Sequence, residues 1–508
     1  MTSARLFARL FSPIERLVAA LTDPARRERT LIAVLFAYVV AWTLYGVLSK
    51  ASADVNPDMA ELVTWARELA LGYPKHPPLA AWVTAAWTVL FPVADWSFYL
   101  LAVMVVAVAL WFAWRLAEDY LDPESRVLGL ALLTLLPFFS FFASKFNPNS
   151  ILIPLWAATA WCFLRSFERR SAGWAALAGL CAAGAMLGKY WSVFLLAGLG
   201  IAALLDSRRA AYFRSAAPWV TIAVGGAVLS PHVAWLIAHD FAPVTYARFV
   251  HVGTDAGSGW KTVNYLAGSA GYVALPVLLA FAAMRPSRAA AADMLWPATP
   301  ARRLVILAFW APLLLPALVA PFAELSLAAL WSMSAWALLP VVLLSSPLVT
   351  LHRPAMLTIV GIAVALPPLM VAAAPMIAIA VYRSEDPLRS HFRLLAERAE
   401  HEWRLVTDKP LRMVGGDGDL AAGAAFYLPG HVSSFPDSRP TMAPWVNETR
   451  LRRDGIAIIC RRDDPDCLGR ARGLGLTEPS VEVDIVRAYH GVAGPVGHYE
   501  IVVVPPRP

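Results

Sequence analysis

The sequence predicts a polytopic α-helical membrane protein with a small α/β domain at its C-terminal end. Hydrophobic residues make up 58% of the 508 residues and charged residues only 16%, whereas a soluble domain contains roughly 25% charged residues. The formal net charge of +7 comes from short basic clusters between apolar segments, which does not favour a nucleic-acid partner. Because so much apolar surface must face lipid, the composition excludes a soluble globular protein, a disordered chain and a coiled coil.

Membrane spans are expected wherever about 20 mostly apolar residues follow one another, and about eleven segments meet this condition. They are residues 31–49, 97–116, 126–143, 150–166, 173–188, 190–205, 217–238, 263–284, 303–322, 325–345 and 355–382. A further apolar segment, 77–93, is short and begins with Pro77–Pro78, so we interpret it as an interfacial or re-entrant helix. No signal-peptide cleavage site follows the first apolar segment, which is therefore expected to remain as an anchor.

Basic residues beside the spans predict the orientation of the chain. Arginines within residues 26–29 precede the first span and place the N-terminus in the cytoplasm. If segment 77–93 does not cross the membrane, three later basic loops also lie in the cytoplasm, and if it crosses they all lie outside. These loops are residues 165–170, 208–214 and 285–303. The positive-inside rule therefore favours an external C-terminus, which requires a true break between two spans at Gly188–Lys189.

The chain is predicted to divide into a membrane domain, residues 1–382, and an external α/β domain, residues 383–508. Charge density rises after Arg383, and short β-like runs appear between turn signals. The expected elements of this domain are a helix from Pro387 to Trp403 and strands at 456–460 and 499–504. The other large external segments are expected at residues 50–93, the candidate catalytic loop, and 239–262.

The four cysteines fall into two environments. Cys162 and Cys181 lie inside apolar segments and are expected to pack as small hydrophobic residues, whereas Cys460 and Cys467 flank a polar loop. A disulfide between Cys460 and Cys467 is expected if this loop lies outside the cytoplasm, and two free thiols if it lies inside. The predicted external C-terminus favours the disulfide.

The first external loop holds the polar residues with the clearest chemical pattern. Asp58 and Glu61 are three residues apart, which places both on one side of a helix that has Pro57 as its first residue. Such acids also occur simply as stabilising charges at a solvated helix N-terminus. The loop continues with Gly72–Tyr73–Pro74–Lys75–His76–Pro77–Pro78–Leu79, so two potential cations stand directly before a rigid double proline.

This loop resembles the signature loop of glycosyltransferase family 39, in which an acid follows the first span, an aromatic-rich helix comes next, and G-Y-x-x-H-P-P-L closes the motif. The family belongs to the glycosyltransferase-C superfamily, with the protein O-mannosyltransferases and the lipid A aminoarabinose transferase as relatives. The resemblance covers the membrane region to about Tyr246. It implies a glycosyltransferase-C type fold of about 11 transmembrane helices, and an enzyme that takes a sugar from a polyprenyl-phosphate donor at the outer membrane face.

The resemblance also implies roles for single residues. Asp58 matches the catalytic acid of the family, with Glu61 as its rival, and His76 matches a position where relatives carry His or a phosphate-contacting Lys. Asn149 stands where the family often has a second acid, and Lys75 where it often has Asp. The chain therefore has fewer acids and more positive charge than its relatives, so no metal site and no cofactor is predicted, although dependence on a divalent metal stays open.

The reaction requires neutralisation of the leaving phosphate and deprotonation of the acceptor. Donor-phosphate contacts are expected from His76, Lys75, Lys145, Lys189, Tyr190 and Arg248. Further substrate contacts are expected from Tyr73, Asn147, Asn149 and Lys261. Each lysine has an alternative role as a side chain that extends from a helix end to the membrane surface. His232, inside a predicted span, is expected to form a helix–helix hydrogen bond.

The predicted function is inverting transfer of a sugar from a polyprenyl-phosphate donor to an envelope acceptor, at the outer face of the bacterial inner membrane. Lipid A, lipopolysaccharide, another glycan, a lipid and a protein all remain open as acceptors. The alternatives are another lipid-linked polymerase or ligase, such as an O-antigen ligase, and a transporter or flippase of lipid-linked sugars. Transporters usually show internal repeats and mid-membrane ionisable residues, whereas the ionisable residues here collect at the external boundary. A receptor or adaptor would not need so many spans.

Overall fold

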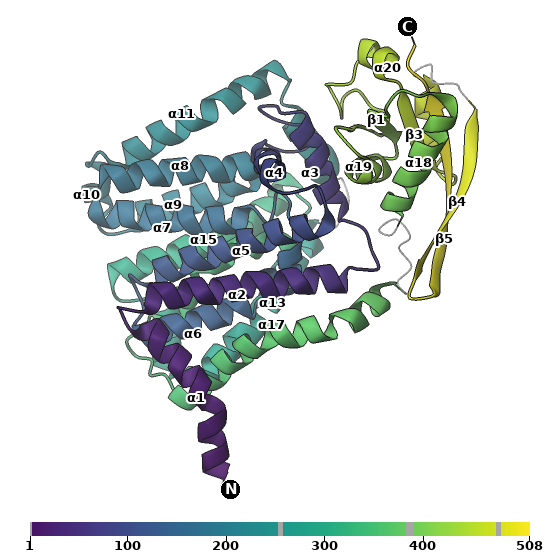
Figure 1. Cartoon of the computed structure of the whole chain (residues 1–508). Helices are drawn as coiled ribbons and strands as arrows, with labels where there is room; N and C mark the ends of the chain where they lie inside the picture. The colour runs from purple at the N-terminus through teal and green to yellow at the C-terminus, as the bar shows by residue number, and fades with distance from the viewer. Residues whose placement is uncertain (1–2, 252–257, 383–390, 474–478, 508) are drawn as a thin grey trace. The chain divides into compact units, whose positions relative to one another are not determined.

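The computed structural model describes residues 3–251, 258–382, 391–473 and 479–507, and its chain forms two compact units (Figure 1). The first unit contains Met1–Trp42, Ala102–Ser144 and Pro148–Met370, and the second contains Thr43–Leu101, Lys145–Asn147 and Val371–Pro508. The first external loop and the C-terminal region thus fall in the same unit. The boundary predicted between residues 382 and 383 stays a prediction.

Helices α2 (Arg27–Ser49), α5 (Asp95–Ala117) and α17 (Arg353–Tyr382) contribute residues to both units. The other helices of the first unit are α1 (Ser3–Thr22), α6 (Pro123–Thr134), α7 (Leu152–Arg169), α8 (Ala172–Gly188), α9 (Val193–Leu205), α10 (Arg209–Phe213), α11 (Ala217–Ala238), α12 (Ala242–His251), α13 (Ser258–Met284), α14 (Arg288–Leu295), α15 (Pro300–Ala323) and α16 (Leu339–Leu344). Short 3-10 helices are η1 (Pro137–Phe139), η2 (Phe141–Ser144), η3 (Tyr190–Ser192) and η4 (Ala329–Leu338).

The described residues include 6 helices that are long and apolar enough to cross a membrane, namely α2, α5, α11, α13, α15 and α17. Shorter apolar helices cover Leu79–Leu90, Ala172–Gly188, Tyr190–Leu205 and Ala329–Leu344. The protein is therefore a multi-pass membrane protein, as its composition predicts. The count of eleven spans stays a prediction.

Two predicted spans differ from single regular helices. Within the span predicted over 126–143, helix α6 ends at Thr134, because Pro137 lacks an N–H group and holds Leu136 in an extended conformation. The span predicted over 325–345 consists of η4 and then α16, with a proline near the start of α16. Both segments are locally less regular than their hydropathy indicates.

The break expected at Gly188–Lys189 is present. Helix α8 ends at Gly188, and Lys189 is extended with φ −164° and ψ 139° before η3 begins. Residues 172–188 and 190–205 are therefore two helices and not one kinked helix, which agrees with the predicted topology.

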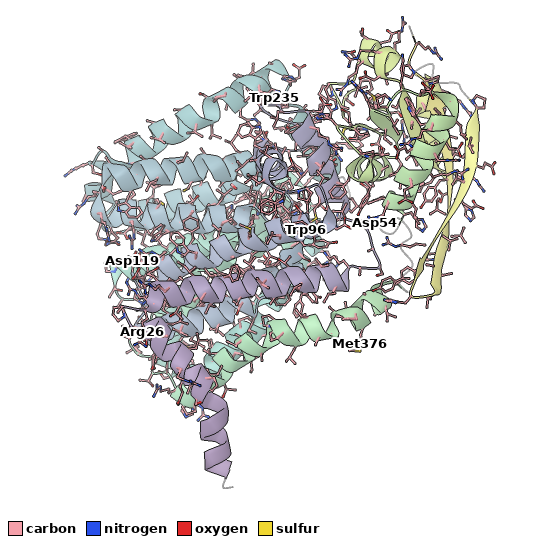
Figure 2. All side chains as sticks on the ribbon, viewed as in Figure 1. Arg26, Asp54, Trp96, Asp119, Trp235 and Met376 are labelled. Atoms are coloured by element: carbon pink, nitrogen blue, oxygen red, sulfur yellow. A yellow bond between two sulfur atoms is a disulfide. The ribbon has the colours of Figure 1, made fainter. Side chains whose placement is uncertain are left out.

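Charged residues gather at one end of the first unit. The guanidinium of Arg27 lies 2.6 Å from the carboxylate of Glu118. Arg165 donates a hydrogen bond of 2.8 Å to Asp119, the residue after Glu118. Figure 2 labels Arg26 and Asp119 at this end. The N-terminal arginines and the basic loop at 165–170 thus lie on the same side of the helices. This is the arrangement predicted if segment 77–93 does not cross, and α4 (Leu79–Leu90) is too short to span.

The second unit contains the first external loop and a small sheet domain. The loop carries α3 (Pro57–Arg67) and α4. The remaining elements are α18 (Phe392–Val406), β1 (Met413–Gly416), α19 (Gly418–Tyr427), β2 (Ser433–Pro436), α20 (Glu448–Asp454), β3 (Ile456–Arg461), α21 (Pro465–Gly473), β4 (Ser480–Tyr489) and β5 (Val492–Val504). The predicted helix corresponds to α18, and its predicted start at Pro387 lies outside the described residues. The two predicted strands correspond to β3 and to the end of β5.

The sheet has the strand order β2-β1-β3-β5-β4. Strand β1 pairs in parallel with β2 and β3, and β5 pairs in antiparallel with β3 and β4. Buried side chains of the sheet form two separate apolar clusters, one of which contains Phe392 and Trp403 of α18. Cys460 and Cys467 form a disulfide with a Cα–Cα distance of 5.8 Å. The predicted α/β character of this region is therefore confirmed.

Candidate active site

Helix α3 presents the two acids predicted to carry the chemistry. Asn56 caps the helix, because its side-chain oxygen accepts a hydrogen bond of 3.1 Å from the backbone N–H of Asp58. Pro57 is suited to the first helical position, where no N–H donor is needed. This local sequence fixes the start of the helix, and with it Asp58 in the first turn and Glu61 one turn later.

Asp58 forms the centre of one cluster. The ammonium group of Lys145 lies 2.8 Å from its carboxylate, and the side-chain amide of Asn147 donates a hydrogen bond of 2.8 Å to the same oxygen. Burial raises the pKa of Asp58, but the charge and hydrogen bond of Lys145, the hydrogen bond of Asn147 and the charge of His76 outweigh it. The pKa of Asp58 is therefore lowered from its ordinary value, and Asp58 is a carboxylate at neutral pH.

Glu61 lies in a different environment on the same helix. Its side chain is only 20% exposed, and Lys75 donates a hydrogen bond of 2.6 Å to it. Burial raises the pKa of Glu61, and the opposing effect of Lys75 does not cancel this rise. Lys75 is predicted to contact phosphate, but in the structure it forms an ion pair with Glu61. To bind a phosphate, the ammonium of Lys75 must either contact the phosphate and Glu61 together or break this ion pair.

Aromatic packing holds the G-Y-x-x-H-P-P-L segment against α3. Tyr73 is fully buried, stacks on Trp65 with a ring distance of 5.0 Å and donates a hydrogen bond of 2.9 Å to the Trp65 carbonyl. The His76 ring lies 6.1 Å from Trp65. Tyr73 therefore packs inside this unit, and its predicted role as a substrate contact stays a prediction. His76 remains close enough to influence Asp58.

The C-terminal domain contacts both ends of α3. Before the helix, the buried carboxylate of Asp54 lies 2.8 Å from the guanidinium of Arg487, and Asp54 is labelled in Figure 2. At its C-terminal end, Arg67 donates hydrogen bonds to the carbonyls of Ala425 and Val432, at 2.8 and 2.7 Å. The helix with Asp58 is thus anchored from both sides.

Glu68, the residue directly after α3, makes a further contact with the C-terminal domain. Arg450 of α20 lies 2.6 Å from the Glu68 carboxylate and donates a second hydrogen bond of 2.6 Å to the Ser433 hydroxyl. In addition, Asp419 at the start of α19 is close enough to contribute to the raised pKa of Glu61 after burial and Asp58. Sequence reasoning missed these residues. The only local signal in the sequence was the Gly- and Asp-rich turn after β1, and this turn does not reveal which residues of α3 it lies near.

The first unit brings together a second group of predicted residues. Lys189 donates a hydrogen bond of 2.6 Å to the Asn149 side chain, and its ammonium lies 5.0 Å from the centre of the Trp331 ring. The Tyr190 hydroxyl forms a hydrogen bond of 2.8 Å with the buried ring of His232. The helix–helix hydrogen bond expected for His232 is therefore present, and a lysine amine occupies the surroundings of Asn149.

Two predicted residues are not part of either group. Arg248 on α12 is exposed, and Lys261 lies near the start of α13. Within the described ranges, neither makes a hydrogen bond or an ion pair with another predicted site residue. The described residues also contain no group of three or more His, Cys, Asp or Glu side chains arranged to hold a metal ion.

Sequence comparison identifies related proteins over part of the chain. Residues 75–235 match the family described as dolichyl-phosphate-mannose-protein mannosyltransferase. The lipid A galacturonosyltransferase RgtD of Rhizobium johnstonii is 28% identical over 222 residues, which are 43% of this chain and 46% of that protein. The aligned region thus spans less than half the length of this relative.

Structure comparison extends the similarity to nearly the whole chain. The crystal structure of ArnT from Cupriavidus metallidurans bound to undecaprenyl phosphate has a TM-score of 0.62 and 14% identity, and the match covers 92% of this chain and 97% of that chain. The apo structure of the same protein gives a TM-score of 0.59 at 13% identity, with the same coverage of both chains.

These matches establish the fold of the protein. The chain has a glycosyltransferase-C fold, with apolar helices followed by a small C-terminal sheet domain. The resemblance that the first external loop predicts is also confirmed, because the matched residues 75–235 begin inside the G-Y-x-x-H-P-P-L segment.

Proposed function

We propose that this protein is an inverting glycosyltransferase that moves a sugar from a polyprenyl-phosphate donor to a lipid acceptor of the cell envelope. The observation that carries the proposal is the Asp58 carboxylate held between Lys145 and Asn147 on a capped helix. The similarity to ArnT, whose structure contains undecaprenyl phosphate, supports the donor class. The similarity to a lipid A galacturonosyltransferase supports a lipid acceptor, with lipid A as the first candidate, and favours a transferase over a flippase or a polymerase.

In the proposed reaction, the Asp58 carboxylate takes the proton of an acceptor hydroxyl. The acceptor oxygen then attacks the anomeric carbon, the bond from this carbon to the phosphate oxygen breaks, and the electron pair leaves with polyprenyl phosphate. A direct displacement of this kind inverts the anomeric configuration. Lys145 and His76 compensate the negative charge that develops on the phosphate. We place the reaction on the outer face of the inner membrane, with the N-terminus cytoplasmic and the sheet domain periplasmic.

We further infer that the transferred sugar carries a carboxylate. Asn149 stands where family members often have an acid, and the amine of Lys189 lies 2.6 Å from it, so the surroundings of Asn149 carry a positive charge. A neutral sugar gains little from such a charge, whereas a uronic acid gains an ion pair. The galacturonic acid named for the relative belongs to this class.

Transfer by the purified protein tests the proposal. The assay contains lipid A and a set of undecaprenyl-phosphate sugars with neutral hexoses, pentoses and uronic acids, and mass spectrometry detects the product. Asp58→Asn keeps the size and polarity of the side chain but removes the base, so the rate should fall on the order of 100-fold or more. A fully active Asp58→Asn beside an inactive Glu61→Gln would assign the base to Glu61, and full activity of both variants would reject this mechanism.

A further inference from the structure

The sheet of the C-terminal domain reverses its strand order at one point. Strands β2, β1 and β3 lie side by side and run parallel, so their carboxyl ends meet at one edge. From β1 the chain passes through α19 to β2, and from β2 it passes through α20 to β3 on the other side of β1. In open α/β sheets, ligands bind in the crevice outside the carboxyl ends of the strands at such a reversal.

The helices agree with this topology, because they cover opposite faces of the sheet. Alternate residues of β3 belong to two different apolar clusters, Ile459 to one and Ile458 to the other, so the clusters lie on opposite faces. Leu420 of α19 belongs to the first cluster, whereas Cys467 of α21 belongs to the second. The loops after β1 and β3 therefore lead to opposite faces of the sheet, with a crevice between them.

The two loops contact each other at the base of this crevice. The backbone N–H of Asp417 donates a hydrogen bond of 3.0 Å to the Ile459 carbonyl. Gly416 permits this approach, since it has a φ of +105° and a Cβ there would lie 2.1 Å from the same carbonyl oxygen. The Arg461 guanidinium lies 3.4 Å from the Asp417 carboxylate. A carboxylate and a guanidinium thus stand side by side where the strand order reverses.

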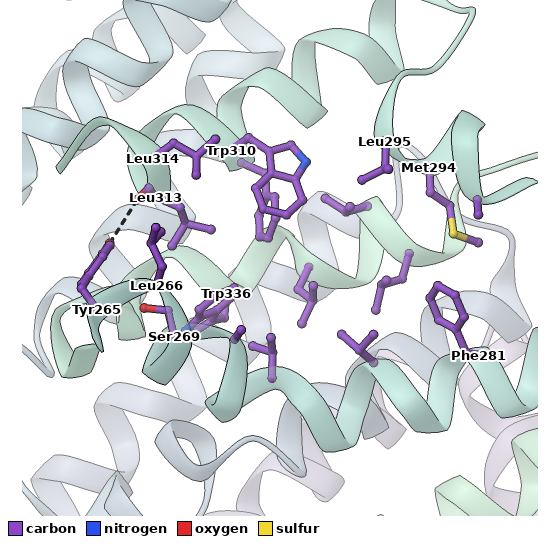
Figure 3. A pocket seen from close by; sticks show the side chains of 18 residues that line it. Tyr265, Leu266, Ser269, Phe281, Met294, Leu295, Trp310, Leu313, Leu314 and Trp336 are labelled. Carbon is purple, nitrogen blue, oxygen red and sulfur yellow. Dashed lines mark hydrogen bonds between the residues drawn. The ribbon is translucent and has the colours of Figure 1, made fainter. Parts of the chain in front are cut away.

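A polar pocket of about 410 Å³ adjoins Arg461 at the carboxyl end of β3. Its lining residues are Arg461, Arg462, Asp463, Val496, Gly497, His498 and Tyr499, and its volume is in the range of small-ligand pockets. By contrast, the cavity of about 330 Å³ inside the first unit is lined mainly by apolar side chains (Figure 3). The pocket of the sheet domain therefore suits a water-soluble, polar group.

Asp419 connects this edge of the sheet with the surroundings of Asp58. It is exposed in the first turn of α19, and α19 packs against α3. Burial raises the pKa of Asp419 most, the charges of Asp417 and Asp58 raise it further, and Lys75 opposes them. Asp419 is therefore close to the catalytic loop and to the crevice, and all these residues belong to the second unit.

The charges at this edge favour hydroxyl groups over a free anion. Besides Arg461, the basic side chains of the pocket are Arg462 and His498, which lie 3.3 and 2.8 Å from the Asp484 carboxylate. Because these groups already have carboxylate partners, a phosphate gains little here. A sugar hydroxyl both donates and accepts hydrogen bonds, so neighbouring carboxylates and guanidinium groups fit a hydroxyl-rich glycan.

We propose that the carboxyl edge of the sheet binds the glycan part of the lipid acceptor, with Asp419 accepting hydrogen bonds from its hydroxyl groups and Arg461 donating to them. Another hydroxyl of the same acceptor then reaches Asp58. This inference rests on the proposed function, because it adds the subsite that selects the acceptor of that reaction. It gives the C-terminal domain a part in substrate recognition.

Steady-state kinetics of the purified protein test the subsite. Asp419→Ala should raise the KM for lipid A about tenfold, as expected for the loss of a charged hydrogen bond. Its kcat at saturating lipid A and its KM for the donor should stay unchanged. Asp408→Ala is the matched control, because Asp408 is exposed and precedes β1, at the opposite end of this strand.

A binding experiment tests the same subsite without turnover. The probe is the glucosamine disaccharide of lipid A, from which the acyl chains and the phosphates have been removed, and calorimetry measures its Kd. Asp419→Ala and His498→Ala should each bind the disaccharide at least fivefold more weakly than the wild-type protein. Both side chains are exposed, so folding is expected to persist. Inorganic phosphate should not compete with the disaccharide.

Three results would overturn the proposal. A wild-type Kd in either variant would remove the glycan from this edge, and competition by inorganic phosphate would make it an anion site. An acid limb of the pH profile that moves in Asp419→Ala, with an unchanged KM for lipid A, would mean that Asp419 acts only through its charge on Glu61. A protein that transfers sugar to lipid A but does not bind the disaccharide refutes this inference alone. A protein that binds the disaccharide but transfers no sugar refutes the proposed function.

Discussion

Lys145 lies 2.8 Å from Asp58 and is the main charge that keeps this carboxylate ionised. In the wild-type protein the pKa of Asp58 is below its ordinary value, so a base at this position stays active to low pH. Lys145→Ala removes both the charge and its hydrogen bond, which leaves the effect of burial less opposed. We therefore expect the acid limb of the pH profile of kcat/KM to move to higher pH in Lys145→Ala.

Lys261→Ala is the control for this shift, because Lys261 makes no hydrogen bond or ion pair with other predicted site residues in the described ranges. It should leave the acid limb where it is. Loss of a phosphate contact alone would raise the KM for the donor without moving the limb. An unmoved limb in Lys145→Ala, together with loss of activity in Glu61→Gln, would transfer the role of base to Glu61, whose pKa is raised by burial.

The contact between Lys189 and Asn149 predicts the preference for an acidic sugar. In Lys189→Met the positive charge is lost while much of the aliphatic side chain remains, so a uronic acid donor loses its ion pair. The kcat/KM for the uronic acid donor should fall at least tenfold, as expected for the loss of a charged hydrogen bond of about 1.5–3 kcal/mol. Competition assays with paired donors measure the ratio directly.

A neutral hexose donor serves as the internal control in the same assay, because its kcat/KM should change much less in Lys189→Met. An equal loss for both donors would indicate that Lys189 contacts the phosphate that they share. This outcome would support the predicted role of Lys189 as a donor-phosphate contact. It would also contradict the inference that the sugar carries a carboxylate.

The ion pair between Arg450 and Glu68 predicts that the C-terminal domain stabilises the catalytic helix. Both side chains are largely buried, with 20% and 15% exposed, so Arg450→Ala leaves an uncompensated carboxylate. The free energy of unfolding should fall on the order of 2 kcal/mol, and kcat should fall because α3 loses one anchor. Arg452→Ala is the matched control, since Arg452 and its partner Glu448 are both well exposed. Equal unfolding midpoints for the two variants would contradict this anchoring role.

The long apolar helices were predictable from sequence because their signal is local. A membrane helix satisfies its own backbone hydrogen bonds within about 20 residues. An apolar run such as Arg353–Tyr382 can therefore be recognised without knowledge of the rest of the fold. The same argument explains why the segment 126–143 is not one continuous helix. A hydropathy profile does not reveal the effect of Pro137 on the backbone. Because of this proline, the helix ends at Thr134, three residues before Pro137.

The candidate site was only partly predictable. Asp58, Lys145 and Asn147 were each predicted, but their mutual contacts depend on the fold. The anchors of α3 could not be predicted, because Arg67 and its acceptor Ala425 are 358 residues apart and no periodic pattern relates them. Likewise, a single sequence contains no signal that pairs Lys75 with Glu61 rather than with a phosphate.

The Cys460–Cys467 disulfide predicts the side of the membrane on which the sheet domain lies. Disulfides persist in oxidising compartments outside the cytoplasm, and the charged end of the first unit is expected to face the cytoplasm. A membrane-impermeant thiol reagent added to intact spheroplasts should therefore label Cys460 and Cys467 only after addition of a reductant. Cys162 and Cys181 are replaced by Ala to remove their background. A cysteine placed at Ser3 is the control for the opposite side and should react only after lysis. Labelling of Cys460 and Cys467 that needs lysis but no reductant would place this domain in the cytoplasm and reverse the orientation.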